Sequence, residues 1–141
     1  MKVLIILLVF LLIQGCNAED SKMLPNGHVV KGALQELKSQ KKFLGNSILF
    51  YPGAPDESTR LSTERIINKA LDKLIDSPAN NLSEKEFWLT LEIAAKQLKL
   101  MDSEEMERGL TYMEDIMEIY EIESSDGRLN DWRYGFEPSS H

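Results

Sequence analysis

The chain has 141 residues, the length of one domain, and carries 16 basic against 23 acidic side chains for a formal net charge of −7. Hydrophobic residues make up 43% and charged residues 28%, which indicates a folded domain rather than a disordered tail. One cysteine and two histidines exclude a disulfide framework, a multi-cysteine metal site and a histidine-rich cluster, and the acidic balance excludes nucleic acid as the main partner.

The first 15 residues have the pattern of a secretory signal peptide. Lys2 precedes an unbroken apolar run over residues 3–13. A helix of that length spans about 16 Å, which is too short for a bilayer core of about 30 Å. A charged start and a short apolar stretch that ends at a small residue are typical of a signal peptide, so residues 1–15 are left out of the fold.

The end of this segment, Ile13-Gln14-Gly15-Cys16, resembles the lipobox of bacterial lipoproteins. The resemblance implies cleavage after Gly15, a diacylglyceryl group on the Cys16 sulfur and a fatty acid such as palmitate on the new amino terminus. Asn17 rather than an aspartate follows, which fits sorting to the outer membrane. Two other interpretations stay open. Cleavage after Ala18 would release a soluble secreted or periplasmic protein, or residues 1–18 could be a helix of the fold.

Cleavage after Gly15 would leave 126 of the 141 residues and would remove Lys2, so the net charge would become −8. Residues 16–24 are polar around Glu19 and Asp20 and are expected to form a tether to the membrane. Pro25-Asn26-Gly27 is a turn signal that ends this tether. Residues 25–141 then form one domain, which is large enough for a single core without disulfides.

The pattern of this domain is helical. The spacing predicts a first helix over residues 28–44 with Gly45 as its stop. Its buried face would consist of Val30, Ala33, Leu34, Leu37 and Leu44. Two prolines and a glycine within residues 52–55 exclude a helix interior there, and Ile48 to Tyr51 could form a short extended piece that packs over the bundle.

Three further helices follow. The second is predicted to begin near Ser62 and to end at Ser77-Pro78, and the third begins with a capping box of Ser83 and Glu86. Asp102 and Glu105 can cap the fourth, whose buried face would be Met106, Leu110, Met113, Ile116, Met117 and Tyr120. Alternation of period two is nowhere long enough for a sheet. We therefore expect an all-α fold, a four-helix bundle or a similar up-and-down helical domain.

The C-terminal tail differs from the helices. Residues 124–131 are rich in turn formers, and Trp132, Tyr134 and Phe136 then alternate at period two. One side of such a segment would press several rings on the bundle, because aromatic side chains bury large areas. The tail is therefore either a packed lid over one end of the core or the aromatic lining of a groove for a ligand or partner.

Two stretches resemble a small family of uncharacterised bacterial proteins, a domain of unknown function. One contains Tyr51-Pro52-Gly53, and the other runs from Ser125-Asp126-Gly127 through Leu129-Asn130 and Trp132 to Tyr134-Gly135-Phe136. The resemblance implies a small helical protein, in some members with a lipoprotein signal. It implies no reaction, no cofactor and no catalytic residue.

Most catalytic and metal sites fail when they are tested on the sequence. If Gly127 is set sixth in a calcium loop, Ile122 and Arg133 fall on ligand positions, which excludes an EF-hand. Neither His28 nor His141 follows a glutamate at the spacing of a di-iron bundle, and no serine-hydrolase elbow or phosphate loop occurs. We expect no cofactor and no metal. A pair of carboxylates for glycoside hydrolysis stays open, because any two of 23 acids could converge.

Charge is the one polarised feature. Residues 102–126 hold ten acids against Arg108, namely Asp102, Glu104, Glu105, Glu107, Glu114, Asp115, Glu118, Glu121, Glu123 and Asp126. Residues 22–45 hold five lysines against Glu36. Either the basic first helix lies near the acidic fourth and relieves its repulsion, or the acids form a docking face for a basic protein, since opposed charge raises the on-rate and selectivity of binding.

The leading hypothesis is a non-enzymatic, lipid-anchored binding module of the bacterial envelope, of which an immunity or inhibitor protein is one form. The lipid on Cys16 would anchor the chain to the membrane, and a partner protein, expected to be basic, would contact acidic side chains or aromatic rings. The candidate partner-binding residues are Glu114, Asp115, Glu118, Glu121, Trp132, Tyr134 and Phe136. Two alternatives are a structural lipoprotein subunit of an envelope assembly and an envelope hydrolase that uses a carboxylate pair.

Overall fold

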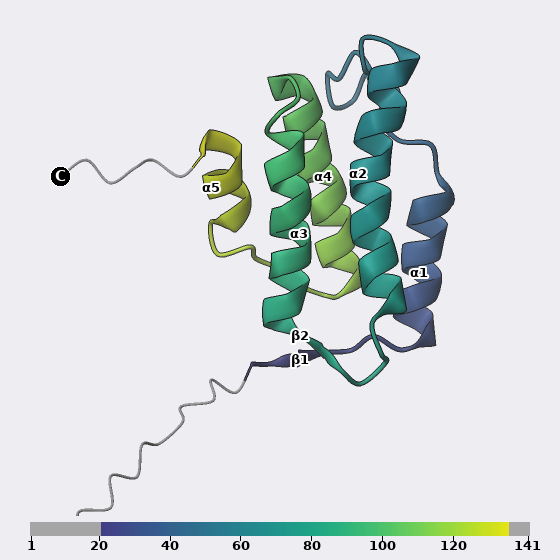
Figure 1. Cartoon of the computed structure of the whole chain (residues 1–141), viewed down its shortest axis with the longest axis vertical. Coiled ribbons are helices and arrows are strands. Elements are labelled where there is room, and N and C mark those ends of the chain that lie inside the picture. The colour runs from purple at the N-terminus through teal and green to yellow at the C-terminus, as the bar shows by residue number, and fades with distance from the viewer. Residues whose placement is uncertain (1–20, 136–141) are drawn as a thin grey trace, which may run out of the picture.

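Four antiparallel helices pack around one apolar core, and a short fifth helix lies against two of them (Figure 1). The computed structural model describes residues 21–135. Its elements are β1 (Met23–Leu24), α1 (His28–Ser39), α2 (Glu57–Asp76), β2 (Leu82–Ser83), α3 (Glu84–Leu98), α4 (Ser103–Ile119) and α5 (Arg128–Tyr134). The predicted all-α, up-and-down architecture is confirmed, with one two-stranded sheet, β1 antiparallel to β2, added to it.

The core follows from the apolar period of the helices. Residues at intervals of three and four in α2, α3 and α4 face the centre of the bundle and are fully buried. They include Ile67, Leu71, Leu74, Phe87, Leu91, Leu98, Met113 and Ile116. Gly109 lets α4 approach α3 closely, because a Cβ atom at this position would collide with the side chain of Leu98.

Helix starts depend on capping. The capping box of α3 is confirmed, since Glu86 N–H donates to Ser83 Oγ at 3.2 Å and Ser83 N–H donates to Glu86 Oε2 at 3.0 Å. The predicted start of α2 near Ser62 is wrong. Asp56 caps this helix by accepting from Thr59 N–H at 2.7 Å, and the first turns are polar, which hides them from a search for apolar periodicity.

The first helix ends earlier than predicted, at Ser39 instead of Leu44. Leu44, expected on the buried face, is half exposed, whereas Lys42 and Phe43 have no exposed surface. The physical reason is that the Lys42 ammonium turns back and takes the carbonyl groups at the end of α1, which the next turn of helix would otherwise need.

The segment that contains β1 lies at the lower end of the bundle in Figure 1. Met23 and Leu24, which we assigned to the tether, form β1 opposite β2, and Leu24 is buried. Asn26 is fully buried: its Nδ2 donates to the carbonyls of Leu74 and Ser77 at 2.9 Å, and its Oδ1 accepts from the Tyr120 hydroxyl at 2.7 Å. The predicted turn is thus a joint between the N-terminal segment, α2 and α4.

The tail is helical rather than extended, so the predicted alternation of its rings is wrong. In α5 residues two apart point in different directions, and Trp132 is buried while Tyr134 is 68% exposed. Trp132 packs edge-on against Trp88 of α3, with ring centroids 6.4 Å apart. Trp132 therefore acts as a lid on the core. Phe136, the predicted signal peptide and Cys16 lie outside the described residues.

Within residues 21–135 no helix combines the length and the apolar character that crossing a bilayer requires.

Substitution of Asn26 tests the joint between the N-terminal segment, α2 and α4. Asn26→Ala leaves two buried carbonyls and the Tyr120 hydroxyl without their partner, so we expect the free energy of unfolding to fall by about 2–4 kcal/mol. Tyr120→Phe removes only one of these hydrogen bonds and is expected to cost about 1 kcal/mol. Urea denaturation followed by circular dichroism measures both. Equal, small losses for the two variants would show that the joint does not stabilise the fold.

Candidate functional site

A groove runs along the outer side of α4. Its upper part, about 460 Å³, lies between α4, α5 and a turn formed by residues 46–51, and is lined by Leu49, Phe50, Leu110 and Leu129 among others. A second hollow shares Glu114, Ser125 and Leu129 with the first and continues it toward residues 121–124. We call the two together the α4 groove.

The α4 groove is strongly acidic. Two arginines line it, Arg108 and Arg133, and six glutamates do so: Glu104, Glu107, Glu114, Glu118, Glu121 and Glu123. All six glutamates are exposed to solvent. Arg133 of α5 forms an ion pair with Glu107, and Arg108 Nη2 donates to the Tyr112 hydroxyl at 3.0 Å. In the lower part of the groove, every charged lining residue is a glutamate.

The 46–51 turn forms one wall of the groove and presents apolar side chains to solvent. Asn46 and Tyr51 exchange backbone hydrogen bonds of 2.8 and 2.9 Å, and Asn46 Oδ1 accepts from the backbone N–H groups of Ile48 and Leu49. Ile48 is 85% and Phe50 94% exposed. The expectation that Ile48–Tyr51 packs over the bundle is wrong for all but Tyr51, because the closed turn projects its tip outward.

The backbone of this turn is strained at the tip. Phe50 has a φ of 53°, a region that residues with a Cβ atom rarely adopt. Gly45 and Gly53 let the two backbone segments at the base of the turn approach closely, since a Cβ on Gly53 would lie 3.0 Å from Gly45 N. Strain of this kind persists only where the surroundings impose it, and it concentrates at functional sites.

Tyr51 fixes the turn to α4. Its hydroxyl donates to Glu105 Oε1 at 3.1 Å, and both side chains are buried. Burial and the bond to Glu105 raise the pKa of the Tyr51 hydroxyl well above its usual range, so that it stays protonated and can donate. The sequence suggested Glu105 as a helix cap, whereas the structure uses it as the acceptor for the turn.

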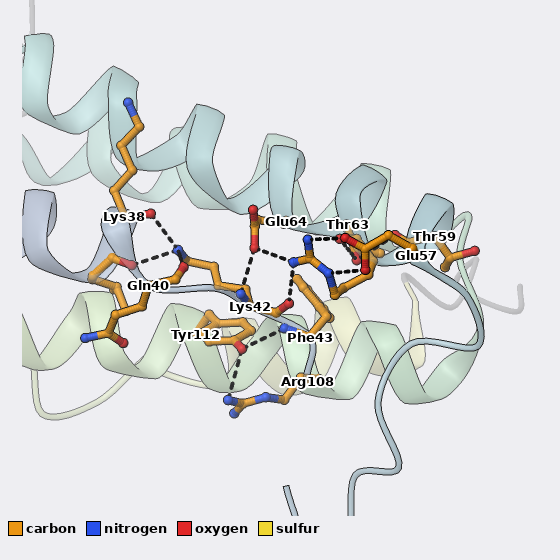
Figure 2. Close-up of polar contacts among 12 residues, drawn as sticks. Lys38, Gln40, Lys42, Phe43, Glu57, Thr59, Thr63, Glu64, Arg108 and Tyr112 are labelled. Carbon is orange, nitrogen blue, oxygen red and sulfur yellow. Dashed lines mark hydrogen bonds and ion pairs between the residues drawn. The ribbon is translucent and has the colours of Figure 1, made fainter. Parts of the chain in front are cut away.

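The segment before the turn is clamped by two helices (Figure 2). Lys42 N–H donates to Glu64 Oε2 of α2 at 2.7 Å, and Arg60 holds this carboxylate at 2.7 Å while it also donates to the Lys42 carbonyl. Phe43 N–H donates to the Tyr112 hydroxyl of α4 at 2.9 Å. The backbone at the base of the turn is therefore fixed to α2 on one side and to α4 on the other.

The Lys42 side chain closes the end of α1. Its ammonium donates to the carbonyls of Leu37 at 2.7 Å, Lys38 at 3.2 Å and Gln40 at 2.9 Å, which satisfies all three N–H groups (Figure 2). Burial lowers the pKa of Lys42 to about 8, against an opposing effect of Glu64. A cation at the C-terminal end of a helix also interacts favourably with the helix dipole.

The structure brings together three of the predicted acidic residues and separates the rest. Glu114, Glu118 and Glu121 line the α4 groove, whereas Asp115 does not, and burial raises the pKa of its carboxyl. Tyr134 lines a separate hollow with Lys99. The two aromatic rings at 132 and 134 thus do not form one binding surface.

Sequence reasoning missed the other wall of the groove. Leu49 and Phe50 lie more than fifty residues before α4 in the chain, and the turn residues around them, Asn46 and Gly53, were the available signal. The basic first helix does pack against α4, although among the described residues no ion pair joins the two helices. Lys38 instead pairs with Asp72 of α2.

No cluster of three or more histidine, cysteine, aspartate or glutamate side chains within residues 21–135 is arranged to hold a metal ion.

Comparison with known families identifies the chain. The model of a domain of unknown function, DUF4844, matches residues 23–137. The chain belongs to the DUF4844 family. This DUF4844 protein is also similar to the crystal structure of a DUF3571 family protein from Acinetobacter baumannii AYE, with 27% sequence identity and a TM-score of 0.63 over 76% of this chain and 89% of that one. No curated protein matches it. The resemblance to an uncharacterised family is confirmed at this level.

The lowered pKa of Lys42 predicts a dependence of stability on pH. The folded chain releases this proton at a pH of about 8 and the unfolded chain at about 10.5, so the unfolded state binds more protons between these values and stability rises with pH. Relative to that of Lys42→Met, the free energy of unfolding of the wild type should rise by on the order of 1–2 kcal/mol between pH 7 and about 9.5. Chemical denaturation at a series of pH values measures this difference. A difference that stays constant over the range would contradict the assignment.

Proposed function

We propose that the chain is a lipid-anchored protein of the bacterial cell envelope that binds a basic segment of a partner protein in the α4 groove and catalyses no reaction. Cys16 would carry the lipid, residues 16–22 would form the tether, and the helical domain would present the groove. An immunity or inhibitor protein is one form that such a module takes.

The charge of the α4 groove carries this proposal. Six exposed glutamates line a single concave surface, and one of its two arginines, Arg133, is already paired with Glu107. The field of several like charges along a groove attracts an oppositely charged segment and speeds its association. Lysine or arginine side chains of a partner would relieve the mutual repulsion of these carboxylates.

The 46–51 turn adds an apolar contact to this charged surface. Phe50 is almost completely exposed at the edge of the groove, and the clamp at Lys42 and Phe43 holds the base of its turn in one conformation. Rigid aromatic side chains lose little entropy on binding and supply much of the energy of protein interfaces. The partner segment that fits best therefore carries an apolar side chain between basic ones.

The position of the groove suits a protein held at its N-terminus. In Figure 1 β1 lies at the lower end of the bundle, whereas the connection between α1 and α2, which contains the 46–51 turn, lies at the upper end. A tether of seven residues spans at most about 25 Å. With the lower end held near a membrane, the turn would point away from the lipid surface toward partners in solution.

The acids of the groove favour binding over hydrolysis. A carboxylate pair for glycoside hydrolysis needs one acid whose pKa is raised within the cleft. The groove glutamates are solvent-exposed, and Asp115, the carboxyl whose pKa is raised by burial, is not among the lining residues. This arrangement supports a non-enzymatic role.

A labelled pentapeptide with one leucine between two pairs of lysines tests the groove. Fluorescence anisotropy should show binding that weakens with added salt, because exposed charge pairs are screened. The double variant Glu114→Lys/Glu118→Lys should bind about thirtyfold more weakly, since each of the two reversed pairs costs on the order of 1 kcal/mol. Phe50→Ser should weaken binding of this peptide but not of one with serine in place of leucine.

The matched control for charge is Glu36→Lys together with Glu92→Lys, which changes the net charge equally at two helices that do not line the groove. If this control weakens peptide binding as much as reversal at Glu114 and Glu118 does, the groove is not the binding site.

The lipid anchor is tested separately in cells that express the full-length chain. Growth with a labelled fatty acid should label the wild type, and Cys16→Ser should abolish the label because it removes the thiol that forms the thioether. The Cys16→Ser protein should also move from the membrane fraction to the soluble or unprocessed fraction. Equal labelling of the two forms would reject the anchor without bearing on the groove.

A further inference from the structure

The outward face of α3 carries an apolar pair that no described element covers. Leu89 and Ile93 are each 51% exposed, although both lie in the middle of the helix. In Figure 1 α3 stands in front of α4, with α5 on one side and α2 on the other, so that its front is open. Glu86 precedes this pair by three residues, and Lys96 follows it by three. We call Glu86, Leu89, Ile93 and Lys96 the α3 stripe.

An apolar hollow lies beside the stripe. It measures about 370 Å³, and its lining from α2 consists of Ile66 and Ala70 with the lysines Lys69 and Lys73 beside them. Leu89, Ile93 and Glu86 line the same hollow from α3. The stripe and the hollow thus form one surface of ridge and groove, which is the shape that packing against another helix requires.

The order of residues in the stripe makes it complementary to itself. Spacings of three, four and three residues keep all four side chains on one side of a helix, as in the seam of a helix pair. If two copies of α3 meet antiparallel about a two-fold axis near Leu91, Leu89 of one lies opposite Ile93 of the other. Glu86 then lies opposite Lys96, so that each copy supplies one partner of two ion pairs.

We propose that a second copy of this chain docks on the α3 stripe, with the two α3 helices antiparallel. Glu86 is the one carboxylate of the stripe and its hollow, against the ammonium groups of Lys69, Lys73 and Lys96, whereas the chain as a whole has a net charge of −7. Two strongly acidic molecules approach each other most easily through a surface that does not share their negative charge. Lys96 is 62% exposed even while it contacts Glu92 at 2.7 Å, so its ammonium is accessible to a carboxylate of the second copy.

The docked pair keeps the α4 groove accessible. The stripe and its hollow belong to α2 and α3 and share no lining residue with the groove, which belongs to α4, α5 and the 46–51 turn. Two chains joined along α3 present two acidic grooves at once. A partner with two basic segments would then bind with an avidity above that of one groove. The docking itself does not depend on what the groove binds.

Disulfide trapping of the full-length chain tests the proposal, with a thiol oxidant added to the cell extract so that linkage does not require export. Differently tagged chains with Leu89→Cys and with Ile93→Cys are expressed together, and disulfide-linked pairs are measured on non-reducing gels. We expect at least fivefold more linked product from this combination than from two chains with Ile48→Cys, an exposed apolar position outside the stripe. Linkage of Leu89→Cys to itself in greater yield than to Ile93→Cys would overturn the antiparallel register.

The charges provide the second arm. Lys96→Glu in both cysteine-bearing chains should lower the linked fraction severalfold, because it opposes two carboxylates. Adding Glu86→Lys to these chains should restore the linked fraction, and circular dichroism verifies that they remain folded. A linked fraction that Lys96→Glu leaves unchanged, or a yield no higher than that of the Ile48→Cys control, would reject docking of a second copy at this face.

Discussion

The backbone at Lys42 and Phe43 is the constraint on which the upper half of the molecule depends. It is held by Glu64 and Arg60 of α2 and by Tyr112 of α4, while the Lys42 ammonium terminates α1. Burial of the Lys42 ammonium costs free energy unless its polar groups are satisfied, as they are here. The positive φ of Phe43 is a second cost, which persists because the surrounding contacts impose it. The result is a fixed base from which the 46–51 turn projects over α4.

The helices with a long apolar period were predictable, and the segments governed by distant contacts were not. The apolar residues spaced around Leu71 and the capping box of Ser83 and Glu86 are local patterns, so α2 and α3 were recognised from the sequence. The end of α1 depends on where the Lys42 side chain goes, and that is decided by tertiary packing. The short α5 places Trp132 on Trp88 of α3, a contact between residues far apart in the sequence that no local pattern encodes.

The candidate site shows the same division. The acidic side of α4 was visible in the sequence because glutamates repeat along one helix, and three of four predicted acids line the groove. A concave surface, however, needs a second wall. Here it is supplied by Phe50 and Leu49, which are held beside α4 by the bond from Tyr51 to Glu105 and by the bond from Phe43 to Tyr112. Composition therefore indicated the charge of the site, while its shape and its apolar edge emerged only from the fold.

The antiparallel pairing of β1 with β2 determines how the domain responds to a mechanical load. Any pull on the chain before residue 21 enters the fold through Met23 and Leu24, whose pairing with β2 is only two residues long. The next attachment is Asn26, whose three side-chain hydrogen bonds reach α2 and α4. Because this pairing is short, β1 would separate from β2 before the helices are pulled apart. Force would then pass through Asn26 to α2 and α4 together.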